Sequence, residues 1–321
     1  MKPAPVALVR GDQSLEGLSA RMWNLKSIED PEEQQRLWLE YQPQIGLFDL
    51  WEVRECFAAA YDRRSIFVTM ERDGRTKAML PLSWIEESAC YGFFPGETWR
   101  GRTWLEQNRL IAESPAVLKQ LLQLAPGPLQ LRYIDGAEML PEMAVEDECN
   151  FGCSPGQYGY SFNNYCKRFS AKTSARIATE FSSLEHHGIR VRLDEFDDLQ
   201  ILFELNLATF GKQSYFCDSR FLTAFDSLAR WLAKERRLSI VSILVGGKVV
   251  AVDMVAIHNN CHLVLAGGAS REIPGISRFI NLYHLERGFL HRVERIDFLC
   301  GDFGWKKKLL LEPRPTWGIM R

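Results

Sequence analysis

The order in which predicted strands and helices follow one another is the same in the two halves of this 321-residue chain. Each half predicts a strand, two helices, three strands, a helix and a closing strand. Alternating apolar residues predict the strands, and apolar residues at helical spacing predict the helices. In the second half the elements are expected, in chain order, at residues 188–193, 195–210, 219–232, 238–245, 248–257, 261–266, 276–292 and 296–299.

The first half repeats this order with weak residue identity. Asp73 with Gly74, and Gly246 with Gly247, are two-residue hairpin turns at matching places in the two halves. Corresponding elements lie roughly 160–175 positions apart, with boundaries good to a few residues. The first-half elements are expected at residues 22–28, 31–41, 48–61, 65–71, 76–85, 89–94, 115–124 and 129–134.

A duplicated unit of this kind predicts an α/β (α+β) protein of two domains. Gly, Pro, Cys and Ser cluster at residues 147–159, which indicates the junction between the domains. We therefore predict domains at residues 1–150 and 151–321. Residues 161–187 are expected to form one long linking helix, which carries Lys167, Arg168, Lys172 and Arg176 on its basic side. This side is either a solvated helix face or a docking surface for an anionic substrate.

Composition excludes several classes of protein. Hydrophobic residues make up 46% of the chain and charged residues 25%, as in a globular protein with sizeable cores. The net charge of −2 argues against a dedicated nucleic-acid binder. Eight cysteines without a C-x-x-C pair predict reduced thiols and no metal site. The N-terminus lacks a signal peptide, and no run of ~18 uncharged apolar residues predicts a membrane span. We expect a cytoplasmic protein.

The loop before the helix at 276–292 is a candidate anion site. Amide groups at a helix N-terminus attract phosphate, and Gly275 lets a ligand approach the backbone. The alternative is an ordinary Pro-Gly turn. The candidate donor-binding residues are Arg271, Pro274, Gly275, Ile276, Ser277 and Arg278.

Two polar residues stand among apolar neighbours in the second half. Asp253 lies in the middle of a predicted strand, where burial of a carboxylate is costly unless it is paired or faces a cleft. His284 lies on the following helix, and its unperturbed pKa suits a general base. The alternatives are a solvent-facing or salt-bridged Asp253 and a surface His284.

Residues 296–308 contain the most distinctive motif. A buried strand ends in a Gly-Asp-x-Gly turn, followed by an aromatic residue and a run of lysines. Asp302 and Lys306 are candidate catalytic residues in this segment. Trp305, together with Arg176 of the basic side, is a candidate substrate contact. Cys300 is expected to be a buried structural thiol.

The second half resembles the GNAT superfamily of acyl-CoA N-acyltransferases. Within it, the chain is similar to the double-domain CelD-like or BioF2-like branch, which is related to the Fem-type aminoacyl transferases. The resemblance covers residues 155–310. It is carried by residues 165–188, the hairpin at 246–251, the Pro274-Gly275 turn and residues 297–306, which resemble the branch's D-F-x-x-G-D-x-x-Y-K ending with Trp305 in place of the tyrosine.

The resemblance implies two tandem GNAT-like domains with mixed, mostly antiparallel central sheets flanked by helices. It implies an N-acyltransferase that moves an acyl group from acyl-CoA, such as acetyl-CoA, to an amine of a sugar, a peptide or a cell-envelope or polysaccharide precursor. The alternatives are an aminoacyl-tRNA-dependent Fem-type transferase and a non-catalytic precursor-binding protein of polysaccharide biosynthesis. We expect small-molecule substrates, no nucleic acid outside the tRNA alternative, no membrane span, no metal, and a monomer or homodimer.

Overall fold

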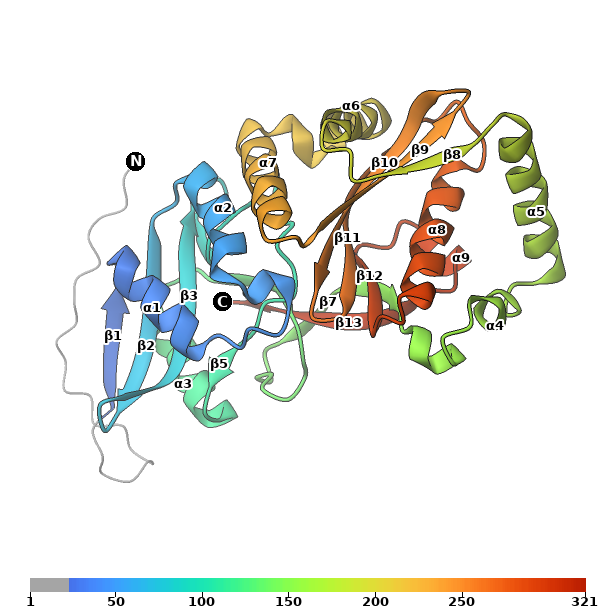
Figure 1. The fold of residues 1–321 in the computed structure, drawn as a ribbon. Helices are drawn as coiled ribbons and strands as arrows, with labels where there is room; N and C mark the ends of the chain where they lie inside the picture. The colour runs from blue at the N-terminus through green and yellow to red at the C-terminus, as the bar shows by residue number, and fades with distance from the viewer. Residues whose placement is uncertain (1–22) are drawn as a thin grey trace.

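A computed structural model of the chain describes residues 23–321, and the predicted element order is present in both halves (Figure 1). Met22 of the first predicted strand, and the N-terminal residues on which the signal-peptide expectation rests, lie outside the described residues. The first half contains β1 (Asn24–Ile28), α1 (Pro31–Tyr41), α2 (Trp51–Tyr61), β2 (Ser65–Arg72), β3 (Arg75–Ile85), β4 (Cys90–Phe93), β5 (Ile111–Ala112), α3 (Pro115–Leu124) and β6 (Gln130–Ile134).

The second half repeats the pattern after a linking segment. The link consists of β7 (Val145–Cys153), α4 (Phe162–Cys166) and α5 (Ala171–His186). The repeat and the C-terminal elements are β8 (Arg190–Leu193), α6 (Asp198–Phe210), α7 (Ser219–Lys234), β9 (Leu238–Val245), β10 (Lys248–His258), β11 (Cys261–Ala269), α8 (Ile276–Leu290), β12 (Arg295–Cys300), α9 (Trp305–Lys308) and β13 (Glu312–Met320). None of the helices within residues 23–321 is both long enough and apolar enough to span a bilayer.

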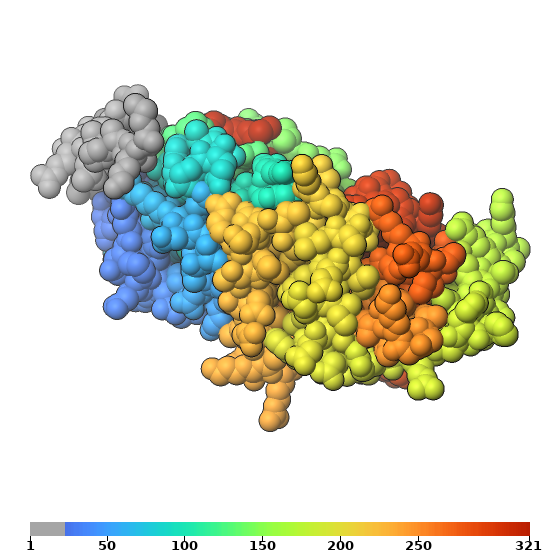
Figure 2. All heavy atoms as spheres, turned by 90° about the horizontal axis from the view of Figure 1, so that it is seen from above, coloured from blue at the N-terminus to red at the C-terminus, as the bar shows by residue number. Residues whose placement is uncertain are grey.

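The strands form two sheets, of which one is antiparallel and the other is mixed but mostly antiparallel. Strands β1 to β4 lie in chain order in one sheet, and β5 pairs with β3. The other sheet has the order β6-β13-β7-β12-β11-β10-β9-β8, in which β11 and β12 are parallel. Helix α6 packs on β10 and β11, whereas α8 packs on β10, β11 and β12. Apolar side chains of α2, α6 and α7 share one core, so the two halves are in direct contact (Figure 2).

Two long strands tie the halves together within one sheet. β13 pairs with β6 from the first half and also with β7, and β7 pairs with β12. β7 therefore crosses the boundary expected after residue 150, and the division into domains at that residue stays a prediction. The sequence did not predict β13, because Pro313 and Pro315 interrupt its apolar pattern.

The predicted single helix at residues 161–187 is wrong. Two helices, α4 and α5, meet at a break over residues 167–170. The hydroxyl of Ser170 accepts a hydrogen bond from the amide of Thr173, which is the interaction of a helix N-cap. Of the 16 residues in α5, only Leu184 is fully buried, and the helix lies at the edge of the molecule (Figure 1).

Strands β11 and β12 are paired at only three positions and separate beyond them, and we call this separation of the strands the opening. The pairing ends at Leu263 and Asp297, although both strands continue. Residues 104–107 of the first half, which we call the bridging segment, contact both strands. Trp104 Nε1 donates to the carbonyl of Leu265 on β11 at 3.3 Å, and the carboxylate of Glu106 accepts from the amide of Cys300 on β12 at 2.7 Å. The segment thus satisfies backbone groups at this opening.

Buried hydrogen bonds hold the bridging segment in place. Arg54 donates to the carbonyls of Phe48 and Phe94 and to Asn108 Oδ1, at 2.7–2.8 Å. The side-chain amide of Asn108, through Nδ2, donates in turn to the carbonyl of Leu105 at 3.3 Å. Burial lowers the pKa of Arg54 to about 10, so its guanidinium stays charged at neutral pH.

We expect Arg54→Met to destabilise the fold strongly. The substitution removes the donor from three buried acceptors, each worth about 1–3 kcal/mol, so the free energy of unfolding should fall by about 3 kcal/mol or more. Urea denaturation followed by circular dichroism measures this change. Arg36→Met, at a side chain that is 61% exposed, is the control and should cost no more than about 0.5 kcal/mol. Equal losses in the two variants would contradict the role of Arg54.

Candidate functional site

Asp253 and His284, predicted separately, are bonded to each other. His284 Nε2 lies 2.8 Å from Asp253 Oδ2, and the two residues are 4% and 6% exposed. Among the described residues the imidazole makes no other hydrogen bond. Because a carboxylate only accepts, Nε2 carries the hydrogen, and in the neutral ring Nδ1 has a free lone pair. The pair has the geometry of a histidine base oriented by a carboxylate.

A glycine lets the carboxylate of Asp253 lie over the neighbouring strand. Asp253 is paired with Gly267 of β11, and a Cβ atom at Gly267 would lie 2.1 Å from Asp253 Oδ1. Any side chain there would displace the carboxylate. The carboxylate therefore lies at the strand that borders the opening between β11 and β12.

Lys306 is held at the other side of this opening. It is only 1% exposed, and its Nζ donates to the carbonyls of Leu299 and Cys300 at 2.8 and 2.7 Å. The rings of Phe151, Phe303 and Trp305 surround the ammonium, with ring centroids 5.3–5.9 Å from Nζ. An ammonium has three hydrogens. Two of them donate to these carbonyls, and the third is left to donate to another acceptor.

A backbone irregularity directs these two carbonyls at Lys306. The pairing of β12 with β7 shifts register between Asp297 and Cys300, and Leu299 has a positive φ of 60°. A leucine in this conformation is uncommon, and such strained residues concentrate at functional sites. The side chain of Asp297 stabilises the bend by accepting from the Leu299 amide at 2.8 Å. The side-chain amides of Gln107 and Asn150 also donate hydrogen bonds to the carboxylate of Asp297.

Burial and charge oppose each other at Lys306. Burial lowers the pKa of Lys306, and the nearby Glu106 carboxyl raises it again. Burial also raises the pKa of Glu106, against the pull of Lys306. The pKa of the Cys300 thiol is raised by burial and by Glu106, so this thiol stays protonated, as expected of a structural cysteine.

The candidate residues form one contiguous group through aromatic rings. The His284 and Phe298 rings are 6.5 Å apart, and the Phe298 and Trp305 rings are 5.6 Å apart. We call Asp253, His284, Phe298, Trp305 and Lys306 the central cluster. Glu106 and Gln107 bond to Cys300 and Asp297 of β12, beside this cluster. They were not predicted, because nothing in the local sequence marks a first-half loop as part of a second-half site.

Two predicted residues lie apart from the central cluster. Asp302 is exposed, where it accepts from the Gly304 amide at 3.1 Å and pairs with Lys307. Arg176 has a 67% exposed side chain and pairs with Glu180 one turn along α5. Within the described part of the chain, neither residue forms a hydrogen bond or a close ion pair with Lys306 or His284.

The predicted donor loop is present at the start of α8, but a carboxylate lies against it. Gly275 has a φ of 85°, and a Cβ atom there would lie 2.9 Å from Cβ of Glu180. Arg278 pairs with Glu180, and Arg271 donates to the carbonyl of Thr209. Ile276 is buried, whereas Pro274 and Ser277 are exposed. His284 follows Gly275 by nine residues, which is about 13 Å along a helix at about 1.5 Å per residue.

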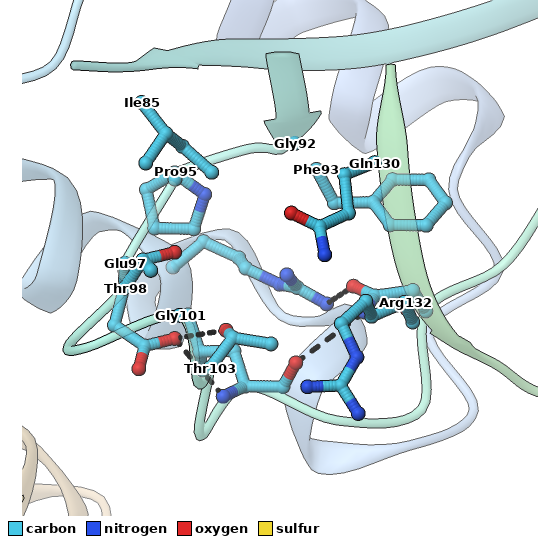
Figure 3. Close-up of a pocket in the computed structure, with 14 residues that line it drawn as sticks. Ile85, Gly92, Phe93, Pro95, Glu97, Thr98, Gly101, Thr103, Gln130 and Arg132 are labelled. Atoms are coloured by element: carbon cyan, nitrogen blue, oxygen red, sulfur yellow. Dashed lines mark hydrogen bonds between the residues drawn. The ribbon is translucent and has the colours of Figure 1, made fainter. Parts of the chain in front are cut away.

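Two hollows lie away from the central cluster. The first, between β4 and β6, is lined by Glu97, Thr103 and Arg132 among others (Figure 3). Its volume of about 30 Å³ suits one or two water molecules rather than a substrate. The second is an apolar groove of about 260 Å³ between α5 and α8, lined by Phe181 and Phe279 among others. Neither hollow is lined by Asp253, His284 or Lys306.

Comparison with known proteins identifies the second half. Residues 171–307 match the family model of the acetyltransferase (GNAT) domain. A search of curated proteins finds no match. A conserved protein of unknown function from Bacteroides thetaiotaomicron shares the fold with a TM-score of 0.57 at 12% identity, over 93% of this chain and 100% of that one.

Two further solved structures have this fold. FemX matches with a TM-score of 0.55 at 8% identity, over 92% of this chain and 97% of that one. L-PGS from Bacillus licheniformis matches with a TM-score of 0.52 at 12% identity, over 91% and 92% of the respective chains. Residues 171–307 therefore match the acetyltransferase (GNAT) domain, and the chain as a whole shares the fold of FemX and L-PGS.

Proposed function

We propose that this protein transfers an acyl group from acyl-CoA to an amine at the opening between β11 and β12. The observation that carries the proposal is the central cluster, in which a carboxylate-oriented histidine and a buried ammonium flank the same opening. Acyl transfer to an amine needs a base for the amine proton and a positive group for the developing oxyanion. His284 and Lys306 have these two chemistries.

In the proposed reaction the amine attacks the thioester carbonyl while His284 Nδ1 takes its proton. Asp253 keeps the imidazole in the tautomer with hydrogen on Nε2 and stabilises the imidazolium that forms. The third hydrogen of Lys306 Nζ donates to the oxyanion of the tetrahedral intermediate. The intermediate then collapses with cleavage of its C–S bond, and the leaving thiolate of CoA takes the proton held by His284, which restores the neutral imidazole.

The phosphates of the donor would bind at the N-terminus of α8, beside Gly275 and Arg278. This requires Glu180 to leave, since its carboxylate now pairs with Arg278 at that place. Only Leu184 of α5 is fully buried, so the helix is weakly packed. Moving the part of α5 that carries Glu180 should therefore cost little free energy. Acetyl-CoA is the simplest donor. We propose as acceptor an amine of a sugar, a peptide or a cell-envelope or polysaccharide precursor.

The donor distinguishes this proposal from its alternatives. An aminoacyl-tRNA-dependent transferase or a non-catalytic precursor-binding protein would not need acyl-CoA. Acetyl-CoA in large excess over its Kd should raise the melting temperature, because a ligand that binds only the folded state stabilises it. No shift with acetyl-CoA or longer acyl-CoAs would contradict acyl-CoA as the donor.

We expect His284→Asn and Asp253→Asn to remove most of the activity. Loss of a general base lowers the rate by about 10²–10⁴-fold, and the fall should appear in kcat more than in KM. Release of free CoA thiol in the presence of an amine panel measures the rate. His186→Asn, at an exposed histidine of α5, is the control and should leave the rate unchanged. Retention of wild-type rates in both site variants would contradict the proposed base.

We expect Glu180→Gln to strengthen acyl-CoA binding. The substitution removes a negative charge from the N-terminus of α8 and releases Arg278, so Kd should fall by about three- to tenfold. Isothermal titration calorimetry with acetyl-CoA measures Kd. Glu185→Gln, at an exposed position of the same helix, is the matched control. An unchanged or weaker affinity in Glu180→Gln would place the phosphates elsewhere.

A further inference from the structure

We propose that Glu106, supplied by the first half, is a positioning residue that keeps Lys306 protonated for acyl transfer. The consequence for catalysis rests on the proposed function, but the charge relation between the two residues does not. A residue of the first half would then control the charge of a proposed catalytic residue in the second half.

Glu106 and Lys306 are both hydrogen-bonded to the backbone of Cys300, one to its amide and the other to its carbonyl. The carboxylate of Glu106 accepts from the Cys300 amide at 2.7 Å, and Lys306 Nζ donates to the Cys300 carbonyl at 2.7 Å. Glu106 is 6% exposed and Lys306 is 1% exposed. The electrostatic attraction between them therefore acts through protein of low polarisability rather than through water.

Glu106 differs from the other carboxylates that act on Lys306. The pKa of Lys306 is lowered by burial and raised by Glu106, Cys300, Asp297 and Glu148, with Glu106 the largest of these four. Asp297 lies 3.6 Å from Arg295, and Glu148 pairs with Arg132 at 3.4 Å. Among the described residues Glu106 forms no ion pair with an arginine. Once ionised, above its raised pKa of about 8, this carboxylate is therefore left to balance Lys306.

Removal of this carboxylate should release the proton of Lys306. A buried ammonium without a counter-charge is costly. A buried lysine in that situation therefore has a lower pKa, and as the pH rises it loses its proton earlier than a compensated lysine does. A neutral Lys306 would stabilise the oxyanion less. Glu106 thus acts on the reaction through Lys306 and has no need to touch the substrate.

The test is the titration of Lys306 in the full-length protein, without substrate. Protein labelled with ¹³C at the lysine Cε carbons is titrated by NMR, and the Lys306 signal is the one missing in Lys306→Met. In Glu106→Gln, whose amide oxygen can still accept from Cys300, we expect the titration midpoint of Lys306 to fall by about one pH unit or more. A purely structural role for Glu106 would not move this midpoint.

Glu97→Gln is the matched control. Glu97 lies on the same loop, is 2% exposed and accepts from the amides of Trp104 and Leu105, but it is not among the groups that act on Lys306. Its variant should leave the midpoint of Lys306 unchanged. An unchanged midpoint in Glu106→Gln, or equal shifts in the two variants, would overturn the proposal.

The kinetic readout separates this inference from the proposed function. If both hold, the alkaline limb of the pH profile of kcat moves to lower pH in Glu106→Gln by the same amount as the NMR midpoint. A shifted NMR midpoint with no acyl transfer from acyl-CoA in the wild type would support the role of Glu106 and contradict the proposed reaction.

Discussion

The structure depends on how the protein satisfies the backbone where β11 and β12 separate. Two parallel strands that diverge leave amide and carbonyl groups without partners, and buried groups of this kind are costly. Trp104 and Glu106 of the first half bond to these groups on β11 and β12, respectively. Arg54 and Asn108 hold the segment that carries them. The opening is therefore built by both halves, although its strands belong to the second.

The same constraint explains where the charged groups lie. The bend at Leu299 directs two carbonyls at Lys306, and the carboxylate of Glu106 bonds to the other side of the bend. A buried ammonium is tolerated here because carbonyls, aromatic rings and a counter-charge replace water around it. At the far end of α8 a carboxylate of α5 lies at the helix N-terminus, so the proposed donor site and the reaction centre are joined by one helix.

Local sequence patterns predicted the fold and part of the site. The repeated element order follows from apolar periodicity, and Asp253 and His284 stood out as polar residues among apolar neighbours. Their pairing, and the roles of Glu106 and Leu299, depend on contacts between distant segments or on backbone conformation, which a single sequence does not reveal. The break at Ser170 was missed because a local N-cap interrupts an otherwise continuous helical pattern. The strand with Pro313 was missed because its pairing with β7 overrides local propensity. Asp302, chosen from its motif, is exposed because Lys307 and the Gly304 amide bind it at the turn.

A crystal structure with a non-reactive thioether analogue of acetyl-CoA tests the central claim most directly. The account predicts that the acyl group lies at the opening between β11 and β12, with its carbonyl oxygen within hydrogen-bond distance of Lys306 Nζ and its carbonyl carbon facing His284. It also predicts the phosphates beside Arg278, with Glu180 displaced. An acyl group bound in the groove between α5 and α8, or in the first half near Glu97, would contradict it.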